Sequence, residues 1–216
     1  MSRAPRSGLM PLPSLHEPDS MLEIRIHGRG GQGNVVAAYL LATAAIKHGR
    51  YGQAFPNFGA ERRGAPVMAF VRITDAPIRR RCQVLEPDFL IVQDDALLHV
   101  PGVTSGLRAG GAILVNSSQD SEALSEQFGT TVYALPATAL ALEHLGRPVP
   151  NTALLAAFLD LTQVLPEQAL FHALEGRFKG RLLDANRTLM ETIVETVPTG
   201  LWADRIPATM EETRHV

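Results

Sequence analysis

The sequence predicts an α/β fold in which a largely parallel sheet is flanked by helices and followed by a helical C-terminal portion. Stretches typical of short strands alternate with helix-patterned stretches between residues 22 and 145, an order that favours parallel strands joined by helices. Beyond residue 151 the strand patterns stop, and apolar residues recur at helical spacing. A glycine cluster between the first expected strand and the first expected helix indicates a turn whose backbone can approach a ligand closely.

Five strands are expected from the pattern of apolar residues. Residues 22–27 and 66–74 alternate apolar with other side chains, as strands with two different faces do. Residues 88–93 and 111–116 contain uninterrupted apolar runs, which are typical of buried strands. A short strand at 131–134 completes the set, so strands and helices alternate through this part of the chain.

Helical spacing of apolar residues predicts the helices, and residues 53–64, rich in Gly, Pro and Arg, are expected to form an irregular loop. Asn34 is expected to cap the first long helix and Gly49 to end it, while Pro166 suits the first turn of a later helix. The C-terminal helices are expected to pack on the sheet and not apart from it. The expected helices are 34–48, 95–100, 121–128, 136–145, 151–164, 166–174 and 180–197.

The length of 216 residues, 45% of them hydrophobic, allows one substantial core with or without a small helical appendage. Residues 1–20 contain four prolines and lack the continuous apolar core of a signal peptide, so they are expected to be a flexible N-terminal extension. Residues 21–197 are expected to form one α/β domain. Residues 198–216, with Pro207 and a charged end, are expected to be a tail or arm.

Charge and cysteine content disfavour several classes of function. The 20 basic and 22 acidic residues leave almost no net charge, which argues against nucleic acid or an anionic membrane as a partner. No run approaches the roughly 20 apolar residues of a membrane span. Cys82 is the single cysteine, so the chain has no internal disulfide, zinc cluster or iron–sulfur site of its own. A reducing compartment, the cytoplasm, is expected.

The pattern Gly28-x-Gly30-x-x-Gly33, with Gly31 inside it, joins a strand to a helix as dinucleotide-binding turns do. Backbone N–H groups at such a helix start stabilise anionic oxygens, so the turn is a candidate phosphate seat. Residues 50–56 contain no acidic residue to bind a ribose, which disfavours NAD. Two local alternatives stay open: the glycines serve only close packing, and the Gln32 amide serves a ligand, a partner or its own turn.

A second candidate site is the stretch Phe55-Pro-Asn-Phe-Gly-Ala-Glu-Arg-Arg-Gly-Ala-Pro66. Arg62 and Arg63 can grip phosphate or carboxylate with two parallel hydrogen bonds, and Glu61 can orient one of them. The alternative is a solvated charge pair beside aromatic side chains that pack in the core.

Other polar groups have simpler explanations. The arginines at 79–81 are typical of an exposed turn, because no aromatic residues accompany them as in nucleic-acid sites. Asp94 and Asp95 follow a strand at the edge where α/β proteins bind ligands, although helix capping by one of them is the commoner explanation. The histidines lack metal-binding spacing, and neither a Gly-x-Ser-x-Gly elbow nor a Walker lysine is present. An isolated catalyst is therefore not expected.

Three blocks together resemble the gamma subunit, or the equivalent domain, of the pyruvate:ferredoxin oxidoreductase family of 2-oxoacid oxidoreductases. The resemblance covers about 22–197 in order and spacing, and it is strongest over the first two blocks. The blocks are Ile26-His-Gly-Arg-Gly-Gly-Gln-Gly33, Phe55-Pro-Asn-Phe-Gly-Ala-Glu-Arg-Arg-Gly-Ala-Pro-Val67 and Pro150-Asn-Thr-Ala-Leu-Leu154.

The resemblance implies one subunit of a complex that decarboxylates a 2-oxoacid oxidatively and transfers the acyl group to coenzyme A. Thiamine diphosphate and iron–sulfur clusters are then expected on alpha-type, beta-type and ferredoxin-like partner subunits, with ferredoxin or another acceptor taking the electrons. This chain is expected to line the active-site cleft and to help bind coenzyme A. The residues assigned to this role are Gly28, Gly30, Gly31, Gln32, Gly33, Glu61, Arg62 and Arg63.

Two other functions stay open at this point. A purely structural assembly subunit would pack its glycine turn against a partner without touching a ligand. A stand-alone nucleotide-binding oxidoreductase is disfavoured, because the acid that binds the ribose is missing.

Overall fold

A computed structural model of the chain describes residues 21–57, 66–207 and 210. Three groups of residues from the sequence predictions lie outside these ranges. They are the N-terminal extension 1–20, the candidate site residues Glu61, Arg62 and Arg63, and part of the C-terminal segment 198–216.

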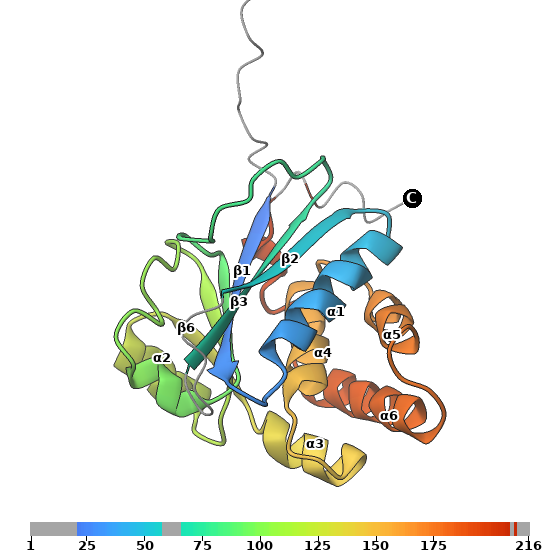
Figure 1. Cartoon of the computed structure of the whole chain (residues 1–216). Helices are drawn as coiled ribbons and strands as arrows, with labels where there is room; N and C mark the ends of the chain where they lie inside the picture. The colour runs from blue at the N-terminus through green and yellow to red at the C-terminus, as the bar shows by residue number, and fades with distance from the viewer. Residues whose placement is uncertain (1–20, 58–65, 208–209, 211–216) are drawn as a thin grey trace, which may run out of the picture.

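The described chain forms one six-stranded sheet in the order β2-β3-β1-β4-β5-β6 (Figure 1). Strands β1, β4, β5 and β6 are parallel, while β3 pairs antiparallel with both β1 and β2. The prediction of a largely parallel sheet is therefore confirmed. The strands are β1 (Leu22–Arg29), β2 (Tyr51–Asn57), β3 (Pro66–Thr74), β4 (Phe89–Val92), β5 (Ala112–Asn116) and β6 (Thr131–Leu135).

The strand β2 corrects the prediction that residues 53–64 are irregular throughout. Gly52 and Pro56 are poor residues for a central strand, but β2 lies at the edge of the sheet, where proline is tolerated. Gly52 also allows close contact with α1, because a Cβ there would lie 2.3 Å from the carbonyl oxygen of Ala42. The pairing with β3, and not the local pattern, makes this segment a strand.

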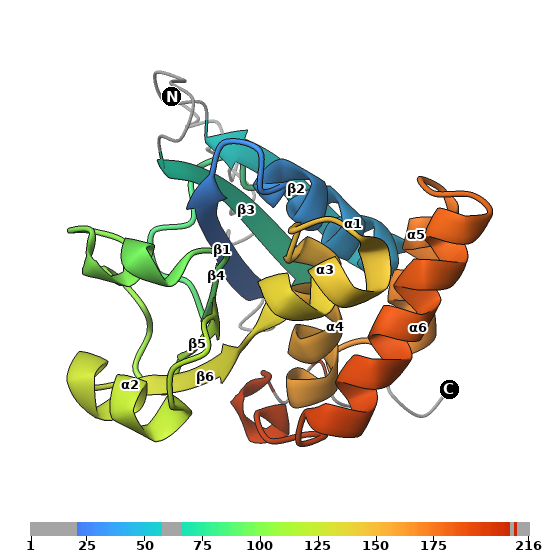
Figure 2. The ribbon, with the colours of Figure 1, turned by 90° about the horizontal axis from the view of Figure 1, so that it is seen from below.

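Helices α1, α3, α4, α5 and α6 lie on one face of the sheet, whereas α2 lies on the other (Figure 2). The expected helical C-terminal portion is present, and α4 packs into the sheet's own core. Helix α1 ends at Lys47, close to the end expected from the sequence. Gly49, two residues later, has a φ of 83°. The helices are α1 (Asn34–Lys47), η1 (Asp95–His99), α2 (Ser121–Phe128), α3 (Ala137–Leu145), α4 (Asn151–Thr162), α5 (Glu167–Glu175), α6 (Arg181–Thr196) and η2 (Ala203–Arg205).

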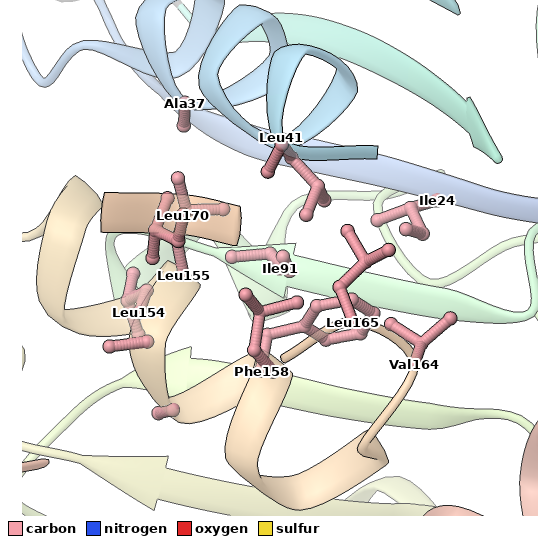
Figure 3. Close-up of a cluster of buried hydrophobic side chains, with 14 of the residues drawn as sticks. Ile24, Ala37, Leu41, Ile91, Leu154, Leu155, Phe158, Val164, Leu165 and Leu170 are labelled. Carbon is pink, nitrogen blue, oxygen red and sulfur yellow. The ribbon is translucent and has the colours of Figure 1, made fainter. Parts of the chain in front are cut away.

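The main core lies between the sheet and α4, whose residues are all buried. Figure 3 shows Leu155 and Phe158 of α4 facing Ile91 of β4, with Leu41 of α1 nearby. Because α4 is buried on every side, neighbouring elements surround it. The strandless C-terminal portion thus shares one hydrophobic core with the sheet.

The segment after α6 differs from the expected tail or arm in its described part. The Trp202 ring is 1% exposed and stacks on Phe89, with ring centroids 5.7 Å apart. The backbone N–H of Trp202 donates to the carbonyl oxygen of Leu161 at 2.7 Å, and the Thr199 hydroxyl donates to the Asp160 carboxylate at 3.1 Å. These contacts fix the segment to the end of α4 and to the core.

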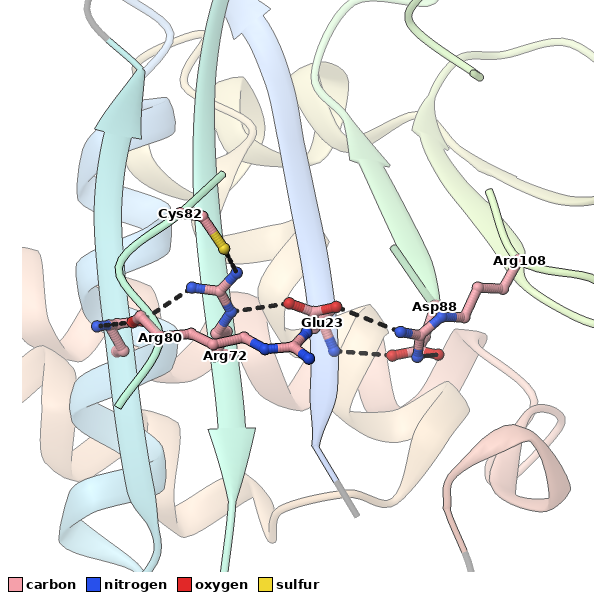
Figure 4. A network of polar contacts seen from close by, with 7 residues as sticks. Glu23, Arg72, Arg80, Cys82, Asp88 and Arg108 are labelled. Atoms are coloured by element: carbon pink, nitrogen blue, oxygen red, sulfur yellow. Dashed lines mark hydrogen bonds and ion pairs between the residues drawn. The ribbon is translucent and has the colours of Figure 1, made fainter. Parts of the chain in front are cut away.

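The polar side of β1 is buried, although strand alternation alone does not tell whether it faces solvent. Glu23 accepts a hydrogen bond from Arg72 of β3 at 2.8 Å, and Arg108 reaches both Glu23, at 3.3 Å, and Asp88, at 2.8 Å (Figure 4). Arg25 donates to the carbonyl oxygens of Val103 and Ser105. The face of the sheet opposite α1 therefore carries a buried network of paired charges.

Candidate functional site

The glycine turn joins the end of β1 to the start of α1, as the sequence predicts. Gly31 and Gly33 have φ values of 96° and 83°, a conformation that L side chains adopt only with strain. Gly33 is the N-cap of α1, and no side chain caps this end of the helix. The prediction that Asn34 is the cap is wrong, because Asn34 is the first helical residue and its side chain bonds elsewhere. The uncapped first turn can bind an anion.

Gln32 closes its own turn. Its side-chain oxygen accepts a hydrogen bond from the Arg29 N–H at 2.6 Å, and its backbone N–H donates to the Arg29 carbonyl oxygen at 3.1 Å. Of the roles left open by the sequence, this oxygen takes the local one. Gln32 therefore contributes to the shape of the turn.

Two asparagines pack directly against the glycines of the turn. A Cβ at Gly28 would lie 2.2 Å from Oδ1 of Asn34, and a Cβ at Gly33 would lie 2.8 Å from Nδ2 of Asn151. Asn151 begins α4 and belongs to the third motif block, so the fold brings the first and third blocks together. No local pattern assigns Asn151 a role, and its place in the third block is the signal in the sequence that points to it.

The second candidate site can be placed only by its flanking residues. Glu61, Arg62 and Arg63 lie outside the described residues. Asn57 ends β2 and pairs with Met68, while Pro66 begins β3 and pairs with Arg29. Both flanking residues therefore lie at the end of the sheet that also carries the glycine turn.

Asp94 lies at the same end of the sheet and makes two contacts. One carboxylate oxygen accepts a hydrogen bond from the Ala96 N–H at 3.1 Å and so caps η1, and the other pairs with Nε of Arg29 at 2.5 Å. Asp95 accepts a hydrogen bond from the Ser117 hydroxyl at 2.7 Å. The capping interpretation of Asp94 is confirmed, and the same residue fixes Arg29 beside the turn.

His27 immediately precedes the glycine turn but is unsuited to acid–base chemistry at neutral pH. Burial, together with the nearby charge of Arg25, lowers the pKa of His27 to about 3. Its Nε2 accepts a hydrogen bond from Nε of Arg25 at 3.2 Å. The neutral imidazole is thus an acceptor that holds a buried guanidinium.

Other features found in the sequence do not join the site. The arginines at 79–81 are exposed, as predicted. Within residues 21–57, 66–207 and 210, no group of three His, Cys, Asp or Glu side chains is placed to hold a metal ion. No helix in this described part of the chain is long and apolar enough to cross a bilayer.

The geometry defines an α/β domain with an uncapped helix start and a glycine turn at the carboxyl end of its first parallel strand. Residues 23–196 match the family model described as pyruvate ferredoxin/flavodoxin oxidoreductase. The chain belongs to this family. It is a gamma-type subunit of a multisubunit 2-oxoacid oxidoreductase.

The relatives that share its sequence agree with this assignment. The chain is 48% identical to pyruvate synthase subunit PorC of Methanothermobacter marburgensis over 77% of its own length and 92% of the relative's. It is 46% identical to the pyruvate/ketoisovalerate oxidoreductases common subunit gamma of Thermococcus kodakarensis, covering 79% of this chain and 94% of the relative.

Two solved structures share the fold. Pyruvate oxidoreductase subunit PORC of Thermotoga maritima is 37% identical, with a TM-score of 0.73, and 82% of this chain and 96% of that chain are covered. A 2-oxoglutarate:ferredoxin oxidoreductase of Magnetococcus marinus, solved with 2-oxoglutarate, coenzyme A and succinyl-CoA, is 20% identical with a TM-score of 0.67. The match covers 83% of this chain and 32% of that longer one, which shows a shared fold.

Proposed function

We propose that this subunit lines the active-site cleft of its complex and helps to bind coenzyme A. The observation that carries the proposal is the uncapped start of α1 behind a turn of positive-φ glycines. Backbone N–H groups at such a turn bind phosphate oxygens, and coenzyme A carries several phosphates. Arg62 and Arg63 supply the countercharge, and Glu61 orients one of them.

The reactive cofactors of the complex belong, in this proposal, to partner subunits. A single exposed cysteine cannot ligate an iron–sulfur cluster, which needs several sulfur ligands. Thiamine diphosphate and the clusters therefore lie on alpha-type, beta-type and ferredoxin-like subunits, where the thiamine supplies the decarboxylation chemistry. Ferredoxin or another acceptor takes the electrons, and a reducing cytoplasm suits the free thiol.

The proposal assigns roles to the residues around the turn. The N–H groups of Gly30, Gly31 and Gly33 bind a phosphate. Gln32, whose own N–H donates to Arg29, and the Arg29–Asp94 pair hold the shape of the turn. Asn151 packs the start of α4 against the turn. In this proposal the chain contributes a wall that positions the acyl acceptor.

Replacing Arg62 and Arg63 together with alanine tests the proposal in the assembled complex. Hydrogen bonds to charged groups contribute about 1.5–3 kcal/mol each, so the KM for coenzyme A is expected to rise about tenfold or more. The KM for the 2-oxoacid and the subunit composition should not change. Arg79→Ala with Arg81→Ala is the matched control, because it removes the same charge from an exposed loop. An unchanged KM in an intact complex would remove both arginines from the acyl-acceptor site.

A second candidate function is assembly alone, with the turn packed against a partner. The hydrogen bond from the Arg29 backbone N–H to the Gln32 side chain favours this alternative, since it gives that side chain a structural role. Under this function, the double alanine variant changes the yield of assembled complex and leaves the KM for coenzyme A unaltered.

A further inference from the structure

The side chain of Asn34 lies over the backbone of Gly28. It is 3% exposed, and a Cβ at Gly28 would meet its Oδ1 at 2.2 Å, its Nδ2 at 2.7 Å and its Cγ at 2.8 Å. Gly28 has ordinary strand geometry, so glycine is required there for space and not for a positive φ. The first residue of α1 thus contacts the strand that precedes the turn.

The same amide also bonds to the neighbouring strand. Nδ2 of Asn34 donates to the carbonyl oxygen of Val67 at 2.9 Å. Val67 is the residue of β3 that pairs with Gly28 of β1. The Asn34 side chain therefore joins the start of α1 to both β1 and β3.

A second buried amide lies on the same face of the sheet. The register of β1 with β4 ends at the pair His27–Val92. The Gln93 N–H donates to the carbonyl oxygen of His27, which continues this register by one residue and brings Gln93 beside Gly28. Paired residues of parallel strands point to the same side, so the Gln93 side chain shares its face with the Asn34 amide. Gln93 is 0% exposed, and its amide atoms and Oδ1 of Asn34 have no hydrogen-bond partner in the described chain.

Buried amides at this place are poor choices for packing alone, because apolar residues fill such positions without desolvating polar atoms. We propose that Asn34 is a positioning residue that fixes the glycine turn against β1 and β3. The effect of this role on the KM for coenzyme A rests on the proposed function, the binding of coenzyme A. The turn is held at its two ends, by Asn34 over Gly28 and by Asn151 against Gly33, so its N–H groups keep one orientation.

Asn34→Leu separates the hydrogen bond from the packing, because leucine keeps the branched shape and cannot donate to Val67. Asn186→Leu in α6 is the matched control. Asn186 is 2% exposed, its Nδ2 donates to the carbonyl oxygen of Leu182 at 2.7 Å, and its Oδ1 also lacks a partner in the described chain. Asn34→Ala is the second variant, because it removes the same bond without adding apolar atoms.

Amide hydrogen exchange and kinetics of the assembled complex give two separate readouts. The reporter amides are those of Arg29, Gln32 and Ala37, which donate hydrogen bonds in and next to the turn. We expect both Asn34 variants to speed exchange at these amides and to raise the KM for coenzyme A about fivefold, with kcat nearly unchanged. Asn186→Leu should alter neither.

The two readouts distinguish failure of this inference from failure of the proposed function. Unchanged exchange in both Asn34 variants, or an equal effect of Asn186→Leu on the turn, overturns the positioning role. Faster exchange with an unchanged KM leaves that role standing and refutes the contact between the turn and coenzyme A.

Discussion

Replacing Arg72 with methionine tests whether the buried charge network stabilises the domain. The Arg72 side chain is 1% exposed, and its Nε donates to the Glu23 carboxylate at 2.8 Å. Its guanidinium also donates to Gln53 at 3.2 Å and lies 5.5 Å from the centre of the Phe55 ring. Methionine keeps most of the packing but leaves the Glu23 carboxylate, itself buried, without its closest cation.

The expected loss in the free energy of unfolding is about 3–5 kcal/mol, the range for removing one partner of a buried ion pair. Only the partly exposed Arg108, at 3.3 Å, then faces the buried Glu23 carboxylate. That is a large share of the roughly 5–15 kcal/mol by which domains are stable. Arg108→Met is the matched control. Arg108 contacts the same carboxylate at 3.3 Å and Asp88 at 2.8 Å, but its side chain is 40% exposed. Its loss is expected to cost about 1 kcal/mol or less.

Urea denaturation measures both variants, and Trp202 fluorescence reports unfolding because this single tryptophan is buried in the core. Glu23→Gln in the Arg72→Met background should recover most of the stability, since a neutral amide needs no cation. The reasoning is refuted if Arg72→Met costs no more than Arg108→Met, or if the second substitution adds to the loss.

Two further predictions concern pH and the C-terminal segment. Burial holds the pKa of His27 at about 3 in the folded state, below the usual 6.5 of a solvated imidazole. The unfolded state therefore binds more protons between these two values, and stability falls as the pH drops from about 6.5 toward 3. In urea titrations at about pH 7 and pH 4.5, His27→Gln should lose less stability on acidification than the parent, and an equal loss would contradict a buried neutral imidazole. Trp202→Ala should lower the free energy of unfolding, measured by thermal denaturation, by about 3–5 kcal/mol, because it leaves a cavity in the core. Leu201→Ala, at the exposed neighbouring residue, should change the free energy of unfolding little. Equally small effects of the two substitutions would contradict the packing of this segment in the core and favour the tail that the sequence predicts.

Much of the candidate site follows from local chemistry and could be predicted. The positive φ of Gly31 and Gly33 requires glycine, so their position in the sequence locates the turn. The role of Asn34 could not be read in the same way, because asparagine before a helix favours capping. Its actual partner, the carbonyl oxygen of Val67, is 33 residues away and reaches it only when β3 pairs with β1.

The sequence by itself determined the alternation of strands and helices, since the spacing of apolar residues depends on neighbours within one turn or one pleat. The tertiary structure decided which polar and apolar groups are buried. Glu23 is sheltered because Arg72, 49 residues later, neutralises it, and Trp202 is in the core because the end of α4 offers it a backbone partner and Phe89 a ring. Such burial depends on partners that are distant in the chain, and no local pattern encodes them.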